Sequence, residues 1–446
     1  MSPRAGWSLM IVDQLFKTSR FEVPSSMEPT GNGEFVPSAP ESLRDTGLTE
    51  GLVESLILKF LLNRSTSPGL DIARQLKLPF KLIEVELRRL KREQLIAHRQ
   101  SSQMHDYLYE LTPTGNEIAQ RYAHTMRYFG AAPIPYSTYM ESVQRQRLNG
   151  TTVTPERLKD ILHGLSIQPH FFQQVGQAIR SARALFLFGA PGNGKTTIAE
   201  RICSAYGPRI WIPRTVVVDG ELMRVYDPTV HKLIKVRDEA PIDHRWVCIQ
   251  RPTVVAGGEL TLENLEITKI GDSGVVESPL QIKSNCGVLV IDDFGRQRCS
   301  PAELLNRWIV PLEMKVDYLN LPSGKKLKTP FEQMIVFSTN LKPRELVDEA
   351  FLRRIPYKVE ARGPANDEFL RLLQSMAAAM HIDYQEAQGQ YLLTQHFGEG
   401  KRELRYCHAR DLLQQAKTAC EFQGRPPEFT TEIIDQAVQN YFVQLD

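Results

Sequence analysis

Short runs of apolar residues, separated by polar and glycine-rich stretches, mark the central part of the chain. Such runs lie at 185–188, 287–291 and 333–338, and a stretch with helical character begins at 197. Continuous apolar runs without polar alternation are typical of strands that are buried on both faces of a parallel sheet. The pattern therefore predicts an α/β fold for this part of the chain.

Residues 48–125 show a different pattern. Helices are predicted at 52–62 and 69–76, from 79 onward and after 115, and two strand-like runs lie at 96–99 and 107–111. This order of helix, helix-turn-helix, hairpin and helix resembles a winged-helix domain, as does the Leu-Thr-Pro-Thr-Gly ending of the hairpin. We therefore expect a small N-terminal domain over 48–125.

Basic side chains are concentrated on the third helix of that segment. They are Lys81, Arg88, Arg89, Lys91 and Arg92. Such residues can contact nucleic-acid phosphates, or they can form a solvated surface. Residues 48–125 hold 11 Lys and Arg against 9 Asp and Glu, a net of only +2, so contact with DNA and contact with a protein are equally open.

Composition separates three further segments. Residues 1–47, rich in Pro, Ser, Gly and Glu, are expected to be a disordered tail. Residues 126–153 are expected to be a linker with one short helix. Residues 208–285, where strand-like pieces alternate with turns, are expected to be a β-rich insertion.

Bulk properties exclude several classes of protein. The chain is 42% hydrophobic and 24% charged with a net charge of +2, so nothing draws the whole molecule to nucleic acid or to a membrane surface. Its six cysteines are scattered and include no C-x-x-C pair, and no apolar stretch is long enough to span a membrane. We expect a cytoplasmic protein with reduced thiols and no membrane partner.

The most informative motif follows the first apolar run. Residues 189–196 fit the pattern G-x-x-x-x-G-K-[ST], which places a phosphate-binding loop between a strand and a helix. Backbone N–H groups of such a loop and the helix N-terminus hold the phosphates of a nucleotide, and the lysine reaches the β- and γ-phosphates. The residues expected to contact the nucleotide are Gly189, Ala190, Pro191, Gly192, Asn193, Gly194, Lys195, Thr196 and Thr197.

Hydrolysis needs further groups, and polar residues end the other two apolar runs. Asp292 is expected to hold Mg²⁺ together with the hydroxyl of Thr196, and Asp293 to orient the attacking water. Asn340 is expected to hydrogen-bond the γ-phosphate or the water, although an asparagine that starts a turn would give the same pattern.

Three arginines later in the chain are candidates for stabilising the charge of the transition state. Arg353 and Arg354 follow a short helix and compete for the role of an arginine finger supplied to a neighbouring subunit. Arg410 lies near the start of a late helix, from which it can reach the γ-phosphate.

The ordered series resembles the AAA+ ATPases. Residues 189–196 correspond to Walker A, 288–293 to Walker B, Asn340 to sensor 1, Arg354 to the arginine finger and Arg410 to sensor 2. The resemblance implies ATP and Mg²⁺, a doubly wound α/β ATPase core over 154–363, a C-terminal helical lid over 364–446, and a homo-oligomeric ring, usually a hexamer. It also places Ile167 against the adenine.

One residue departs from that pattern, because Asp293 stands where the family usually has Glu. The shorter side chain leaves the rate of hydrolysis open. Residues 317–330 alternate around Pro322-Ser-Gly324 and are similar to the hairpin that precedes sensor 1 in some AAA+ groups, with lysines near its tip. These lysines can contact a nucleic acid or an acidic protein, or remain solvated.

Two functions agree with these features. The first is an ATP-hydrolysing oligomeric motor that remodels a protein or a nucleic acid. The second is a nucleotide-dependent regulatory switch or scaffold with slow hydrolysis, whose N-terminal domain binds DNA or a protein.

Overall fold

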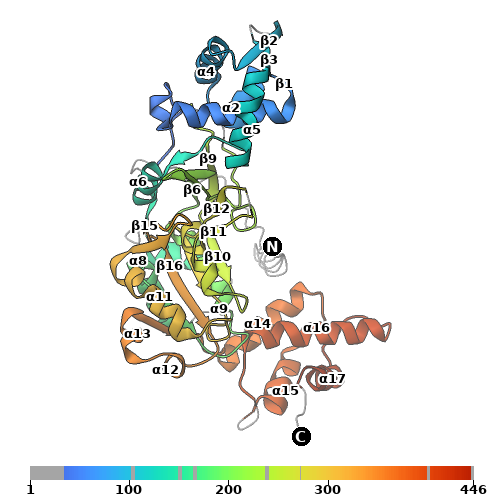
Figure 1. The fold of residues 1–446 in the computed structure, drawn as a ribbon. Helices are drawn as coiled ribbons and strands as arrows, with labels where there is room; N and C mark the ends of the chain where they lie inside the picture. The colour runs from blue at the N-terminus through green and yellow to red at the C-terminus, as the bar shows by residue number, and fades with distance from the viewer. Residues whose placement is uncertain are drawn as a thin grey trace.

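The computed structural model describes residues 35–101, 106–148, 153–163, 168–236, 241–271, 273–398 and 402–442. These residues form four parts: a small N-terminal unit, a β-rich region, an α/β core and a helical lid, of which the β-rich region and the core alternate along the chain (Figure 1). Residues 1–34 of the expected tail and the adenine candidate Ile167 lie outside the described residues.

The α/β core is built on a five-stranded sheet in the order β10-β13-β16-β5-β17. All its pairings are parallel. The strands are β5 (Leu185–Phe188), β10 (Thr253–Ala256), β13 (Val288–Ile291), β16 (Met334–Thr339) and β17 (Tyr357–Glu360). The three apolar runs of the sequence thus become buried strands of one parallel sheet, as expected, and β16 lies between β13 and β5.

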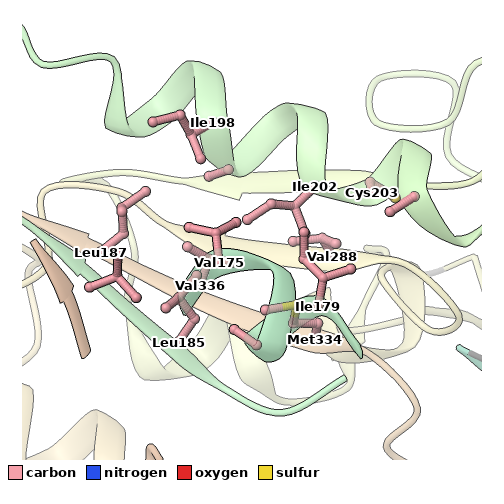
Figure 2. Close-up of a cluster of buried hydrophobic side chains, with 14 of the residues drawn as sticks. Val175, Ile179, Leu185, Leu187, Ile198, Ile202, Cys203, Val288, Met334 and Val336 are labelled. Atoms are coloured by element: carbon pink, nitrogen blue, oxygen red, sulfur yellow. The ribbon is translucent and has the colours of Figure 1, made fainter. Parts of the chain in front are cut away.

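Helices cover both faces of this sheet, since alternate side chains of each buried strand point to opposite sides. On one face, Leu185 and Leu187 pack against α8 (Pro169–Ser181) and α9 (Lys195–Ile202), as Figure 2 shows. On the other, Phe186 and Phe337 pack with Trp308 of α11 (Pro301–Met314). The core is therefore a doubly wound α/β domain.

Shorter elements complete the core. They are α7 (Pro155–Ile161), η4 (Cys203–Tyr206), η5 (Leu262–Leu265), α10 (Leu280–Lys283), α12 (Pro343–Leu346) and α13 (Glu349–Arg354). None of the helices in the described part of the chain is both long and apolar enough to cross a membrane.

The β-rich region differs from its expected bounds. Its strands are β6 (Arg209–Pro213), β7 (Thr215–Val218), β8 (Glu221–Arg224), β9 (Trp246–Gln250), β11 (Thr268–Lys269) and β12 (Val275–Glu277). They form a sheet β11-β12-β8-β7-β4 and a pair β6-β9. The expected insertion over 208–285 wrongly includes β10, which belongs to the core sheet beside β13, because β-branched residues suit either sheet.

The expected linker over 126–153 is also corrected. It contains β4 (Ile134–Pro135), which pairs with β7, and α6 (Tyr136–Gln146). Tyr139 and Val143 of α6 are buried in the hydrophobic core of the β-rich region. The segment is thus part of that region, since its apolar side chains are buried in the same core.

The hairpin expected at 317–330 is present as β14 (Val316–Asn320) and β15 (Lys326–Pro330). Leu319 and Leu327 are buried in the core of the β-rich region. At the turn, the Lys325 ammonium lies 3.5 Å from the Asp219 carboxylate, and the Ser323 N–H donates to Glu221 Oε1 at 3.0 Å. The hairpin is therefore packed against the β7–β8 turn.

The N-terminal unit contains η1 (Arg44–Thr46), α2 (Glu50–Arg64), β1 (Thr66–Pro68), α3 (Gly69–Leu76), α4 (Phe80–Arg92), β2 (Ile96–Ser101), β3 (Tyr107–Leu111) and α5 (Pro113–Thr125). Its antiparallel sheet has the order β1-β3-β2. The short β1, which directly precedes the helix expected at 69–76, was not expected. The identification of this unit as a winged-helix domain stays a prediction.

The basic helix of this unit, α4, is partly neutralised by its own neighbours. The Arg89 guanidinium lies about 3 Å from each of the carboxylates of Glu54, Glu86 and Glu93. Arg88 pairs with Glu84 at 2.6 Å. Arg89 is thus committed to ion pairs within the unit, which weakens its candidacy as a phosphate contact.

The chain before residue 48 contributes to the folded structure. Phe35 packs edge-on against Trp246, and Ser38 forms a β-bridge to Ile242. The Arg245 guanidinium donates to the carbonyl oxygens of Thr46 and Pro133. The expected disordered tail therefore does not extend to residue 47.

The lid consists of α14 (Asn366–Ala379), α15 (Glu386–His396), α16 (Tyr406–Phe422) and α17 (Thr431–Tyr441). Their buried residues, among them Phe369, Leu412 and Ile433, form a separate hydrophobic cluster. The lid lies to one side of the carboxyl ends of the core strands (Figure 1).

Candidate nucleotide-binding site

The phosphate loop connects β5 to α9 and depends on glycine at three positions. Gly189, Gly192 and Gly194 have φ values of 140°, 84° and 75°, which L-residues with a Cβ rarely adopt. A Cβ added at Gly189 would lie 2.4 Å from the Ala361 carbonyl oxygen, and one at Gly192 would lie 2.2 Å from Cys407 Sγ. The loop is thus pressed between the core and the lid.

The ammonium group of Lys195 lies on the inner side of this loop. Its Nζ donates to the carbonyl oxygens of Gly189 and Ala190 at 2.9 and 3.0 Å, and to Asn340 Oδ1 at 2.7 Å. Burial lowers the pKa of Lys195, while the carboxylate of Asp292 acts in the opposite direction. The side chain is only 7% exposed, so its charge is held at the loop.

Thr196 and Asp292 meet although they are far apart in the sequence. The Thr196 hydroxyl donates to Asp292 Oδ2 at 2.9 Å. The hydroxyl of Thr196, in the first turn of α9, and the carboxylate of Asp292, after β13, are oxygen ligands of the kind that Mg²⁺ prefers. Among the residues that the structure describes, no group of three or more His, Cys, Asp or Glu side chains forms a metal site, so a Mg²⁺ ion here would need water or phosphate ligands as well.

Asp293 and Asn340 are also neighbours. Asn340 Nδ2 donates to Asp293 Oδ1 at 3.1 Å, so Asn340 links Lys195 to Asp293. Asp293 has a φ of 49°, a left-handed conformation that aspartate tolerates better than most residues. The turn after β13 therefore directs two successive carboxylates to the same edge of the sheet.

The lid reaches this site through the start of α16. The Cys407 N–H donates to the Gly192 carbonyl at 3.0 Å, and the Tyr406 N–H donates to Asn193 Oδ1 at 3.4 Å. Asn193 Nδ2 in turn donates to the Ala361 carbonyl at 2.9 Å. The lid is thus tied to the phosphate loop by hydrogen bonds from two main-chain N–H groups of α16.

These elements enclose a cleft of about 500 Å³. Its lining combines the loop with carboxylates, an amide and lid residues, namely Pro191, Gly192, Asn193, Gly194, Lys195, Thr196, Thr197, Ile198, Asp292, Asp293, Ser338, Asn340, Leu372, Met376, Tyr406, Cys407 and Arg410. Leu372, Met376, Tyr406 and Cys407 were not expected there, because nothing in the sequence shows which side of the lid faces the loop.

The three candidate arginines are placed differently. Arg410 lines the cleft, and its guanidinium contacts Asp411 at 2.8 Å. Arg354, at the end of α13, pairs with Glu313 at 2.7 Å and donates to the Ala350 carbonyl at 3.0 Å. Neither Arg353 nor Arg354 is among the residues that line the cleft of their own chain.

Comparisons with known proteins match parts of the chain. A family model described as a domain of unknown function, DUF8689, matches residues 365–440, which span most of the lid. No curated protein matches the chain.

Several solved structures are similar in part. The RuvB Holliday junction branch migration motor of Thermotoga maritima has 14% identity and a TM-score of 0.38, covering 63% of this chain and 71% of its own. NtrX of Brucella abortus, solved in complex with ATP, has 12% identity and a TM-score of 0.39, covering 63% of this chain and 56% of its own.

Five parallel strands, with the phosphate loop after β5 and the carboxylates after the nearby β13, place Lys195 and Asp292 in one cleft. The chain therefore contains a doubly wound, phosphate-loop α/β core with a helical C-terminal lid.

Proposed function

We propose that this protein binds ATP with Mg²⁺ and hydrolyses it. The observation that carries the proposal is that the lysine, the hydroxyl, two carboxylates and an amide expected from the sequence converge in one cleft. They come from three adjacent strands of the sheet, β5, β13 and β16. Such convergence at the carboxyl ends of parallel strands is where α/β proteins bind ligands.

The chain supplies each group that the reaction needs. The N–H groups of the loop and the start of α9 face the phosphates, and Lys195 exchanges its contacts with two loop carbonyls for contacts with β- and γ-phosphate oxygens. Thr196 and Asp292 are the residues that would hold Mg²⁺, directly or through water. The ion would neutralise charge on the phosphates when bound.

Asp293 is the proposed residue that orients the attacking water. Asn340 donates to one of its carboxylate oxygens, which leaves the other oxygen to accept a hydrogen bond from water. Asn340 thereby positions Asp293 and connects it to Lys195, so a change in the lysine's contacts alters the surroundings of the carboxylate. Arg410 is proposed to approach the γ-phosphate from the lid.

Arg354 and its neighbour Arg353 are proposed to act on the site of a second subunit in a homo-oligomeric ring, with a hexamer as the expected form. Their position outside the cleft of their own chain supports this. In such a ring the protein would be a motor that remodels a protein or nucleic-acid partner.

A second candidate is a nucleotide-dependent switch with slow turnover. The side chain of Asp293 favours this alternative, because it is shorter than that of Glu and one of its carboxylate oxygens already accepts a hydrogen bond from Asn340. An N-terminal winged-helix domain would then dock DNA or a protein in response to the nucleotide.

One set of measurements tests the proposal and separates the two candidates. ATP binding and steady-state turnover are measured for the wild type, Lys195→Ala and Asp293→Asn, with the exposed Asp367→Asn on α14 as the matched control. We expect Lys195→Ala to lose binding and Asp293→Asn to keep it but lose turnover. Unchanged binding in Lys195→Ala would refute the site.

The same assay is repeated with single-stranded DNA, double-stranded DNA and folded protein, alongside the mass of the assembly. Stimulated turnover by a ring supports the motor. Tight binding with negligible turnover under every condition supports the switch.

A further inference from the structure

A second cavity lies far from the nucleotide cleft, in the N-terminal unit. Its volume is about 340 Å³, and it is formed by α2, α5 and the segment that follows α5. The residues that matter for its chemistry are Lys59, Asn63, His124, Arg127, Tyr128 and Phe129. Its size is at the lower end of the range for small-molecule sites.

The cavity has a polar, basic side. Lys59 is only 3% exposed, and its ammonium donates to the Met126 carbonyl at 3.1 Å. Burial alone lowers the pKa of Lys59 to about 8, so no carboxylate offsets the cost of burying this charge. His124 and Arg127 also line the cavity, and none of its lining residues is acidic.

Part of the cavity lining is apolar and aromatic. Phe129 is 43% exposed and stacks on the buried Phe60, with ring centres 5.7 Å apart and planes 3° from parallel. Leu62 and Ala123 add apolar surface. A buried cation beside a flat aromatic wall suits a ligand that has an anionic group at one end and an apolar ring at the other.

The segment that forms this cavity is fixed to the β-rich region. The Arg127 N–H donates to the Ser273 carbonyl at 2.9 Å, and the Tyr128 hydroxyl lies 2.9 Å from the Thr215 hydroxyl at the start of β7. A ligand in the cavity would therefore contact the junction between the N-terminal unit and the β-rich region.

We propose that this cavity is a binding site for a small organic carboxylate with an apolar, ring-sized body, whose carboxylate accepts a hydrogen bond from the Lys59 ammonium. The site is independent of the nucleotide cleft. Arg127 supplies further positive potential, and Phe129 provides the wall for the ring.

The experiment uses the full chain, benzoate as the probe and benzamide as its uncharged counterpart. Binding is measured by calorimetry at pH 7, and lysine side chains labelled with ¹³C at Cε are followed by NMR. We expect saturable benzoate binding that Lys59→Met weakens at least about tenfold, the loss typical of a hydrogen bond to a charged group. Lys81→Met, on the exposed start of α4, is the control and should bind as the wild type does.

NMR gives an answer even if Lys59→Met fails to fold. In the wild type, the Lys59 signal, which is retained in Lys195→Ala, should titrate near pH 8, and benzoate should raise its pKa because a bound carboxylate favours the ammonium form. Benzamide should not. Non-saturable binding, equal binding of benzamide, or a benzoate effect on other lysines only would each overturn the proposal. Nucleotide is absent throughout, so the result is independent of ATPase activity.

Discussion

Replacing Arg245 by Met should destabilise the region where the N-terminal segment, the segment before α6 and the β-rich region meet. The Arg245 guanidinium donates to both oxygens of the Asp243 carboxylate, from Nε to Oδ1 at 3.0 Å and to Oδ2 at 3.1 Å, and from Nη2 to Oδ2 at 2.8 Å. Its Nη1 also donates to the carbonyls of Thr46 and Pro133. Both charged side chains are about 95% buried or more, at 4% and 5% exposure.

The magnitude follows from what the substitution leaves behind. Removing one partner of a buried ion pair typically costs about 3–5 kcal/mol, because the other charge stays buried without compensation. Of the hydrogen bonds that the structure describes to the Asp243 carboxylate, the one from the main-chain N–H of residue 245 would remain. Two carbonyl oxygens would lose a donor as well, so we expect a loss of at least about 3 kcal/mol.

The assay is unfolding in urea, monitored by limited proteolysis and by tryptophan fluorescence. Fluorescence is informative because Trp246 directly follows Arg245 in the chain. The chain has several separate hydrophobic clusters, which can unfold in separate transitions, so the comparison is made for the transition that Trp246 reports. Arg371→Met is the control: its ion pair with Asp367 is more than 70% exposed on both sides and should be worth less than about 1 kcal/mol.

The double variant Arg245→Met with Asp243→Asn removes both charges. It should recover part of the loss, since no unpaired charge then remains buried. If Arg245→Met costs no more than Arg371→Met, the ion pair does not join these segments, and the reasoning is refuted.

Three further predictions concern the cleft and the lid. Gly192→Ala should weaken ATP binding about tenfold or more, because the added Cβ would clash with Cys407 and the φ of residue 192 is positive. Adding Cys407→Gly to this variant should restore part of the affinity in a binding titration. If it restores none, the clash with Cys407 is not the cause of the loss. Burial lowers the pKa of His408 to about 4, so between about pH 6.5 and pH 4 the unfolded lid binds a proton that the folded lid does not. The stability of the lid should therefore decrease as the pH is lowered through this range, and it should decrease less in His408→Leu. Equal pH dependence of the two proteins in calorimetry would contradict this. Arg354→Ala should lose turnover and regain it when mixed with Lys195→Ala subunits, and a mixture without activity would count against an arginine supplied by a neighbour.

The sequence by itself determined the α/β core and most of its site. The apolar runs that became β5, β13 and β16 carry their own signal, because strands buried on both faces must be apolar along their whole length. The motif around Lys195 and the carboxylates after β13 predicted where the candidate site lies. Ligand groups in a parallel sheet follow the carboxyl ends of strands, so their position can be read along the chain.

The tertiary structure alone decided which surfaces meet. Nothing local to Thr253 shows that β10 completes the core sheet, because a short β-branched run fits either sheet until its neighbours are known. Docking of Cys407 on Gly192, burial of Lys59 beside an aromatic wall, and the joining of residues 46, 133 and 245 all depend on contacts between distant segments. Periodicity reports which side of an element is apolar, whereas the identity of the surface that covers it is fixed only when the whole chain has packed.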